Sequence, residues 1–212
     1  MSRETPAAAV PEQATPNPLL LVISGPSGVG KDTVLARLKE RGRPFHYTVT
    51  MTTRPPREDE AADGPFLRFA SEEEFDRLLA EDGFLEHAQV YGYRYGVPKA
   101  PVREALAGGR DVVVRVDVQG AATIKALAPE ALLIFLAPRS IEELEARMRA
   151  RGGVEEGTLA RKLEAVAREM DQRRYFDYTV VNEEGRVDEA VDAVLAIVEA
   201  DRRRGGRGPV HL

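Results

Sequence analysis

The hydrophobic positions of the chain are concentrated in four short continuous runs. These runs are LLLVIS at 19–24, VVVRV at 112–116, LLIFL at 132–136 and YTVV at 178–181. A continuous apolar run of this length is typical of a strand in a parallel sheet, because helices cover both faces of such a sheet. The four runs therefore predict a buried parallel sheet.

Between these runs, the apolar positions follow a helical period. In KDTVLARLKERG, Val34, Leu35 and Leu38 fall on one helical face, and Gly42 follows as a stop signal. Two later segments begin with a capping box, in which Ser is followed three residues on by Glu. They are Ser71 with Glu74, and Ser140 with Glu143. Strands that alternate with helices predict a doubly wound α/β domain.

Three segments depart from this alternation. Residues from about 50 to 98 are polar and rich in Pro, Arg and Tyr, which predicts an inserted α+β subdomain. Residues 1–17 are rich in Pro and Ala without an apolar core, so we expect a disordered tail and no secretion signal. Residues 204–212 are basic, and we expect a frayed tail in preference to a nucleic-acid contact. The predicted domain therefore spans 18–203.

Composition narrows the classes of function. With 212 residues, of which 43% are hydrophobic, the chain can bury one good core. Its net charge of −5 gives no support to a nucleic-acid or membrane-surface binder, and it has no cysteine for disulfides or thiolate metal sites. We expect a cytoplasmic protein, monomeric or homo-oligomeric, that binds small molecules and neither nucleic acid nor a membrane.

The segment GPSGVGKDT lies between the first apolar run and the first predicted helix. Its G-x-x-x-x-G-K pattern is typical of a loop whose backbone N–H groups and following helix N-terminus cradle phosphates, with Lys31 reaching the outer ones. The predicted nucleotide-binding residues of this loop are Gly25, Ser27, Gly28, Val29, Gly30, Lys31, Asp32 and Thr33. The alternative is an ordinary strand-to-helix turn with a solvated Lys31.

One residue of this loop is unusual. Asp32 stands where such a loop has a Ser or Thr that ligates Mg²⁺. A carboxylate beside phosphates is tolerable only if a cation intervenes, so we predict that Asp32 ligates Mg²⁺ directly or through one water. Thr33 points about 100° away along the helix and is expected to reach the inner phosphate. In the alternative, Asp32 turns away and caps the helix.

Three further motifs carry candidate chemistry. TMTTRPPRE holds Arg54 and Arg57 on a stiff segment, and paired guanidiniums suit a phosphate monoester. FLEHAQVYGYRYG contributes Glu86 and Tyr95, and VDVQG places Asp117 at the carboxyl end of a buried strand, where such sheets bind ligands. The structural alternatives are a solubilising arginine pair, a solvated Glu86, a packed Tyr95 and a helix-capping Asp117.

In this order, these segments resemble the guanylate kinase family, P-loop kinases that phosphorylate GMP from ATP. The resemblance covers about residues 19–200, and TTRPPRE, FLEHA and DVQGA are specific to it. It implies a doubly wound P-loop kinase core, an inserted GMP-binding subdomain at about 50–98 and a helical lid at about 147–162. It also implies Mg²⁺ as cofactor, with ATP as co-substrate.

The resemblance also implies residue roles. The GMP phosphate would be bound by Arg54, Arg57 and Tyr95, while Thr50 and Glu86 would contact the base. A carboxylate matches two adjacent donors on guanine, whereas adenine presents an acceptor there. Asp117 would lie beside GMP and the Mg²⁺. The catalytic cations would be Lys31, Arg147 and Arg151, and Asn182 would lie beside the adenine of ATP. An exposed charged helix face is the alternative for Arg147 and Arg151, and local backbone bonding for Thr50 and Asn182.

Four positions depart from the family pattern. Leu67 replaces a phosphate-binding Tyr, and Val97 replaces a Ser or Thr beside the base. Arg115 stands where the family has the first carboxylate of a D-x-D or E-x-D motif, and Lys162 stands at a lid arginine. These changes bear on rate and GMP affinity more than on the class of reaction.

The sequence therefore predicts a kinase that makes GDP from GMP, and dGDP from dGMP. Two alternatives stay open. One is a kinase that resembles ribose 1,5-bisphosphate phosphokinases, whose loop also reads GKD followed by Ser or Thr. The other is a non-catalytic guanylate-kinase-like module that binds phosphopeptides.

Overall fold

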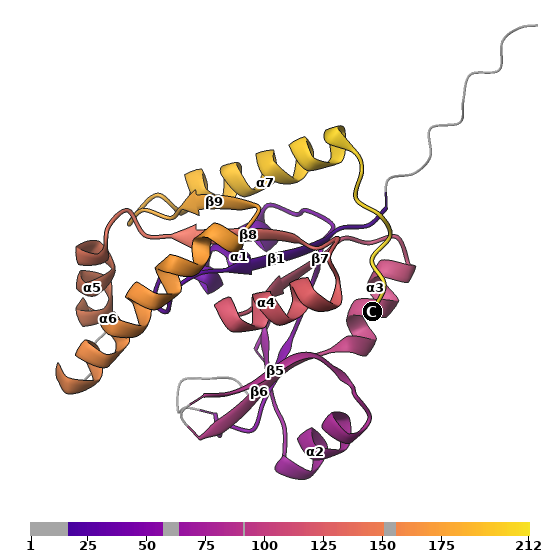
Figure 1. Ribbon diagram of the computed structural model, residues 1–212, viewed down its shortest axis with the longest axis horizontal. Helices are drawn as coiled ribbons and strands as arrows, with labels where there is room; N and C mark the ends of the chain where they lie inside the picture. Colours follow the sequence, from indigo (N-terminus) through magenta and orange to yellow (C-terminus); the bar gives the residue numbers. More distant parts are fainter. Residues whose placement is uncertain (1–16, 57–63, 91, 151–155) are drawn as a thin grey trace, which may run out of the picture.

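The structure, a computed structural model, describes residues 17–56, 64–90, 92–150 and 156–212 (Figure 1). Five strands form a parallel sheet: β1 (Leu20–Ser24), β2 (His46–Tyr47), β7 (Val112–Arg115), β8 (Leu132–Ala137) and β9 (Tyr178–Val181). Their order is β2-β7-β1-β8-β9. The four predicted strands are all in this sheet, and β2 is a short additional edge strand.

Helices bury both faces of the parallel sheet. On β1, Leu21 and Ile23 belong to one hydrophobic cluster, and Leu20 and Val22 belong to the other. The helices that cover the first face are α1 (Lys31–Glu40) and α7 (Val187–Arg204), and those that cover the second are α3 (Lys99–Ala107) and α4 (Val118–Leu127). This arrangement confirms the predicted doubly wound core.

A second sheet lies beside the first. Its strands are β3 (Thr50–Thr52), β4 (Leu67–Phe69), β5 (Phe84–Val90) and β6 (Tyr93–Pro98), in the order β4-β3-β6-β5. The sheet is mixed, because β3 pairs parallel with β4 and antiparallel with β6. Helix α2 (Glu72–Ala80) packs on it through Phe75, whose ring stacks on Phe84 at 4.4 Å. The predicted insert is therefore a small α+β unit with its own core.

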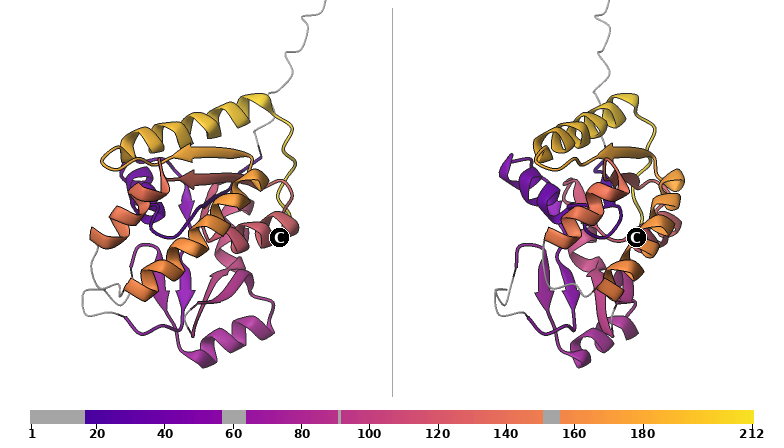
Figure 2. Two further views of the ribbon diagram at one scale, coloured as in Figure 1. Left: turned by 60° about the vertical axis from the view of Figure 1, so that its left-hand side comes forward. Right: turned by 90° about the vertical axis from the view of Figure 1, so that its left-hand side faces the viewer.

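Two capping boxes begin helices as predicted. The Ser71 hydroxyl accepts a hydrogen bond from the Glu74 N–H at 3.2 Å, and the Ser140 hydroxyl accepts one from the Glu143 N–H at 3.2 Å. Ser140 precedes α5 (Ile141–Ala150), which is followed along the chain by α6 (Glu156–Asp171) and the 3₁₀ helix η1 (Gln172–Tyr175). Helix α6 crosses in front of the parallel sheet and extends toward the second sheet (Figure 2).

The C-terminal tail packs against the domain. Arg207 pairs with Asp201 at 2.8 Å and with Asp177 at 3.3 Å, while Val210 and Leu212 pack against the cluster under α3 and α4. The expectation of a frayed tail is therefore wrong, since these two apolar side chains and one guanidinium give the tail fixed partners. Within the described residues, no helix has the length and apolar character needed to cross a membrane.

Candidate active site

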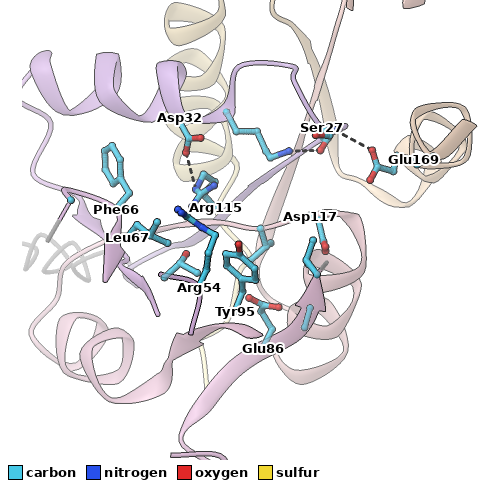
Figure 3. A pocket seen from close by; sticks show the side chains of 18 of the residues that line it. Ser27, Asp32, Arg54, Phe66, Leu67, Glu86, Tyr95, Arg115, Asp117 and Glu169 are labelled. Atoms are coloured by element: carbon cyan, nitrogen blue, oxygen red, sulfur yellow. Dashed lines mark hydrogen bonds and ion pairs between the residues drawn. The ribbon is translucent and has the colours of Figure 1, made fainter. Parts of the chain in front are cut away.

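A pocket of about 770 Å³ opens at the carboxyl ends of β1 and β7, between the two sheets and α6 (Figure 3). It brings together most of the residues that the sequence singled out. Those that line it are Gly25, Ser27, Lys31, Asp32, Thr50, Arg54, Glu86, Tyr95 and Asp117. The glycine-rich loop forms one end of the pocket, and Glu86 lies toward the other.

The loop follows a backbone path that requires glycine. Gly25 has φ 144°, and a Cβ there would lie 2.2 Å from the Leu136 carbonyl oxygen. Gly30 is the N-cap of α1 with φ 94°, in the left-handed region. Gly25, Ser27 and Lys31 line the pocket, and α1 begins at Lys31, so the N-terminus of this helix borders the pocket, an arrangement that favours bound anions.

Lys31 lies at the start of α1 and folds onto the loop. Its Nζ donates hydrogen bonds to the carbonyl oxygens of Gly25 at 2.6 Å and Pro26 at 3.1 Å. Burial, and after it the positive charge of Arg115, lower the pKa of Lys31 to about 8. An anionic phosphate in this pocket would favour the charged ammonium, so Lys31 has the position and chemistry of a phosphate ligand.

Asp32 points toward the pocket. Its Oδ1 lies 3.1 Å from the Nε of Arg115, at the end of β7, and its side chain is 71% exposed. Helix α1 has no side-chain cap, since Gly30 is its N-cap. The geometry thus favours a role in the pocket over helix capping. Thr33 is exposed and does not line the pocket.

Glu86 is placed by an irregularity in β5. The pairing register with β6 shifts between Phe84 and Glu86, so Leu85 is an extra residue that enters the core below. The side chain of Glu86 lines the pocket although the residue is only 8% exposed. Burial, and after it the charge of Asp117, raise the pKa of Glu86 to about 7. A buried carboxylate facing a cavity is a strong acceptor for paired ligand donors.

The other predicted acceptor-site residues surround Glu86. Thr50 is buried at 8% exposure and lines the pocket, and Tyr95 lies next to Glu86 (Figure 3). Arg54 donates from Nη1 to the Pro55 carbonyl oxygen at 2.9 Å, and its Cζ lies 5.3 Å from the centroid of the Phe69 ring. This contact holds the guanidinium at the pocket wall. Arg57 lies outside the described residues.

Asp117 combines two features predicted as alternatives. Its Oδ1 accepts a hydrogen bond from the Gly120 N–H at 2.8 Å, so it is the N-cap of α4. It also lines the pocket, at the carboxyl end of the parallel sheet. The cap fixes the side chain at the edge where ligands bind in such sheets.

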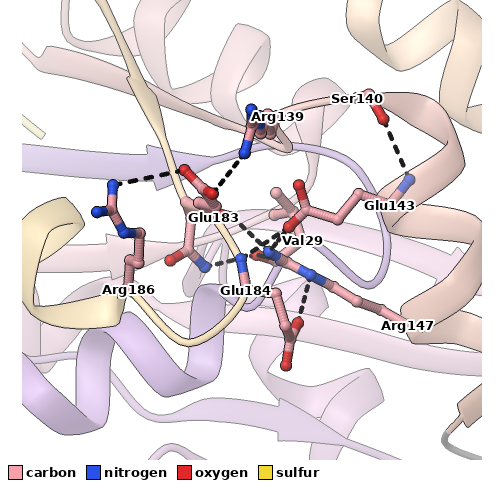
Figure 4. A network of polar contacts seen from close by, with 9 residues as sticks. Val29, Arg139, Ser140, Glu143, Arg147, Glu183, Glu184 and Arg186 are labelled. Carbon is pink, nitrogen blue, oxygen red and sulfur yellow. Dashed lines mark hydrogen bonds and ion pairs between the residues drawn. The ribbon is translucent and has the colours of Figure 1, made fainter.

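Neither Arg147 nor Asn182 lines the pocket, and Arg147 lies beside Val29 of the loop (Figure 4). The Asn182 amide donates to the Val29 carbonyl oxygen at 2.7 Å, and Arg147 donates to the Asn182 carbonyl oxygen at 2.8 Å. Arg147 also pairs with Glu143 and, at 2.5 Å, with Glu184. In this arrangement both residues support the loop from behind and do not cover the pocket. Arg151 lies outside the described residues.

Two charged residues of the pocket had no role in the sequence prediction. Glu169 of α6 accepts a hydrogen bond from the Ser27 N–H at 3.2 Å, and Arg115 pairs with Asp32. Glu169 is 142 positions from Ser27, and no local pattern marks it. A place for Arg115 in the pocket could be predicted from the sequence, because Arg115 stands at a position where the family pattern has a carboxylate. Leu67 and Lys162, two other departures, also line the pocket.

Comparisons with known proteins show which family this chain resembles. The sequence profile of the guanylate kinase family matches residues 17–201. The chain is 47% identical over 188 residues to a guanylate kinase of Thermus thermophilus, with 89% of this chain and 84% of that protein covered. It is 41% identical to one of Caldanaerobacter subterraneus, with 89% and 90% covered. The crystal structure of guanylate kinase from Anaplasma phagocytophilum superposes with a TM-score of 0.74 at 29% identity, covering 91% of this chain and 90% of that one.

Proposed function

Because this chain belongs to the guanylate kinase family, we propose that it transfers the γ-phosphoryl group of ATP to GMP, and to dGMP as a second acceptor, in the pocket between its two sheets. The observation that carries the proposal is the continuity of that pocket. It joins the glycine-rich loop and the partly buried Lys31 to a buried carboxylate, Glu86, on the second sheet.

The acceptor end is built to recognise guanine. Ionised Glu86 accepts hydrogen bonds from guanine N1–H and the exocyclic amine, and the buried carboxylate would lack that match with adenine. Thr50 contacts the base from β3. Arg54, Arg57 and Tyr95 bind the GMP phosphate, with guanidinium forks suited to its oxygens. Asp117 borders the acceptor from its place at the start of α4.

The donor end is proposed to hold the phosphates of ATP. The N–H groups of the loop between Gly25 and Thr33, and the ammonium of Lys31, would bind the chain of phosphates, and Asn182 is proposed as the residue beside the adenine. Arg147 and Arg151 are proposed as cations that act on the transferring phosphoryl group when the lid closes. For Arg147 this requires a change from its present contacts with Glu143 and Glu184. Phosphoryl transfer depends mainly on positioning and on such charge stabilisation.

The pocket fits Mg²⁺ bound together with a nucleotide. Within the described residues no cluster of three or more carboxylate or imidazole groups could hold a metal alone. Mg²⁺, however, is usually held by one or two carboxylates together with substrate phosphates, and Asp32 and Asp117 both line the pocket. We propose these two carboxylates as its protein ligands, direct or through water. Bound there, the ion would neutralise charge on the outer phosphates.

We also propose a cytoplasmic location, where both nucleotide substrates occur. The acceptor is tested with a coupled assay of ADP release across GMP, dGMP, AMP, CMP, UMP and ribose 1,5-bisphosphate. Turnover should be fastest with GMP, and dGMP should be the next best acceptor. Preference for ribose 1,5-bisphosphate would instead support the related phosphokinase, and phosphopeptide binding without turnover would support a non-catalytic module.

A further inference from the structure

Two unusual residues of the sequence, one in the phosphate loop and one at a departure from the family pattern, are in contact in the structure. Asp32 replaces a hydroxyl residue in the phosphate loop, and Arg115 replaces a carboxylate at the end of β7. Although 83 positions apart in sequence, the Asp32 Oδ1 and the Arg115 Nε lie 3.1 Å apart. The negative charge and the positive charge thus occur together, on neighbouring elements that both border the pocket.

Arg115 lies between the two ends of the pocket. In Figure 3 its side chain lies between Asp32, on the loop side, and Arg54, on the acceptor side. The positive charge of Arg115 acts on residues at both ends of the pocket. It lowers the pKa of Lys31 at the loop end and opposes the rise in the pKa of Glu86 at the acceptor end. Three cations, Lys31, Arg115 and Arg54, therefore line the same pocket.

The contact with Asp32 leaves Arg115 capable of further bonding. The Arg115 Nε is buried and, although near Asp32, has no hydrogen bond of acceptable geometry. Its side chain is 23% exposed and lines the pocket. An ion pair with a carboxylate as exposed as that of Asp32 contributes little to stability. A guanidinium whose Nε faces Asp32 can still present the N–H edge of its two Nη groups to phosphate oxygens.

We propose that Arg115 is a catalytic residue that binds the phosphoryl group in transit between ATP and GMP, and that Asp32 is a positioning residue that holds its guanidinium there. This inference rests on the proposed kinase function. It adds a cation at the midpoint of the pocket, near Leu67, where the family pattern has a phosphate-binding Tyr. A charge at the midpoint acts on the transferring group more than on either substrate alone.

The test separates binding at the midpoint from binding at either end. The bridging probe is a dinucleotide in which adenosine and guanosine are joined by five phosphates, so that its central phosphates span the two substrate sites. Its Kd is measured in EDTA, beside the Kd of GMP and of ADP alone. The variants are Arg115→Met and Arg115→Lys. The matched control is Arg43→Met, because Arg43 lies outside the pocket lining, pairs with Glu199 at the same 3.1 Å and also has a buried Nε without a hydrogen bond.

For Arg115→Met we expect the Kd of the bridging probe to rise roughly 10- to 100-fold, the cost of losing hydrogen bonds from a charged group. The Kd of GMP and of ADP should change by less than about threefold. The kcat of Arg115→Met with GMP should fall roughly 100-fold. The kcat of Arg115→Lys should fall less, since lysine keeps the positive charge but lacks the paired N–H groups of the guanidinium. Arg43→Met should match the wild type in every binding measurement.

Asp32→Asn tests the positioning role without metal. In EDTA, Asp32→Asn should raise the Kd of the bridging probe severalfold in an otherwise wild-type chain. In a chain that already carries Arg115→Met, it should cause no further rise in that Kd. If Arg115→Met lowers the melting temperature strongly, Arg115→Lys and Asp32→Asn still decide the matter.

Two results would overturn the proposal. One is a bridging-probe Kd in the Arg115 variants no different from that of Arg43→Met. The other is an equal loss for GMP alone, which would make Arg115 an acceptor-site residue only. If the wild type itself binds neither GMP nor the bridging probe, the kinase function fails; if the wild type turns over GMP normally while the Arg115 variants match the control, only this inference fails.

Discussion

Replacing Glu86 by Gln should change stability and catalysis in opposite directions. The substitution keeps the shape of the side chain and removes its charge. In the folded protein the pKa of Glu86 is raised from 4.5 to about 7, chiefly because the residue is buried at 8% exposure. Keeping this carboxylate ionised therefore destabilises the fold, and the same ionised carboxylate is needed for guanine.

The magnitude follows from the two pKa values. Because the folded pKa lies above the unfolded one, the folded state binds more protons between pH 4.5 and about 7, and stability falls as pH rises through this interval. At about 1.4 kcal/mol per pH unit, the full cost above pH 7 is roughly 3 kcal/mol. Glu86→Gln removes that cost, so its stabilising effect should be about 2 kcal/mol larger at pH 8 than at pH 5.

The assays are urea unfolding of the nucleotide-free protein at both pH values and steady-state kinetics with GMP and AMP. In kinetics, Glu86→Gln should lose about 2 kcal/mol or more in kcat/KM for GMP, roughly 30-fold, because the new amide presents a donor to a guanine donor. AMP, which does not use the carboxylate, should lose less. Equal losses for the two nucleotides, or a stability change that does not depend on pH, would refute this reasoning.

Three further predictions concern the same pocket. Lys31→Met should lower kcat roughly 100-fold or more and leave the Kd of GMP in calorimetry nearly unchanged, since it removes charge at the transferring phosphates and not at the acceptor site; near-normal turnover would contradict that role. Asp32→Ala should raise the Mg²⁺ concentration for half-maximal activity and Asp32→Ser should shift it less, whereas an unchanged Mg²⁺ titration would remove Asp32 from the metal site. The kcat/KM of the wild type for GMP should fall about tenfold per pH unit below a pKa near 7, because Glu86 becomes protonated there. In Glu86→Gln that fall should be absent, and kcat/KM should fall only below about pH 6, where the phosphate of GMP itself takes up a proton.

The core of the fold could be predicted because its signals are local. Strand β1 is apolar on both faces, since Leu21 and Leu20 enter different clusters, and that produces the continuous run read from the sequence. The glycine-rich loop follows it directly and needs left-handed backbone at Gly30. The edge strand β2 could not be found, because two half-buried residues carry no periodicity.

The parts of the site that could not be predicted depend on distant partners. Glu143 lies in the capping box at the first turn of α5, but its carboxylate pairs with Arg147 and accepts a hydrogen bond from the Glu184 N–H at 2.7 Å. That network holds Arg147 behind the loop. The packing of the tail could not be predicted for a similar reason, because its basic and glycine-rich composition gives no local signal that Val210 and Leu212 pack against the domain.

The central claim is that this pocket moves a phosphoryl group from ATP to GMP. The most direct test incubates the protein with Mg²⁺, GMP and ATP labelled with ³²P at the γ position, and separates the products by chromatography. The account predicts that the label appears in the β-phosphate of GDP, in step with ADP formation. Label that remains in ATP, or that is released only as inorganic phosphate, would contradict it.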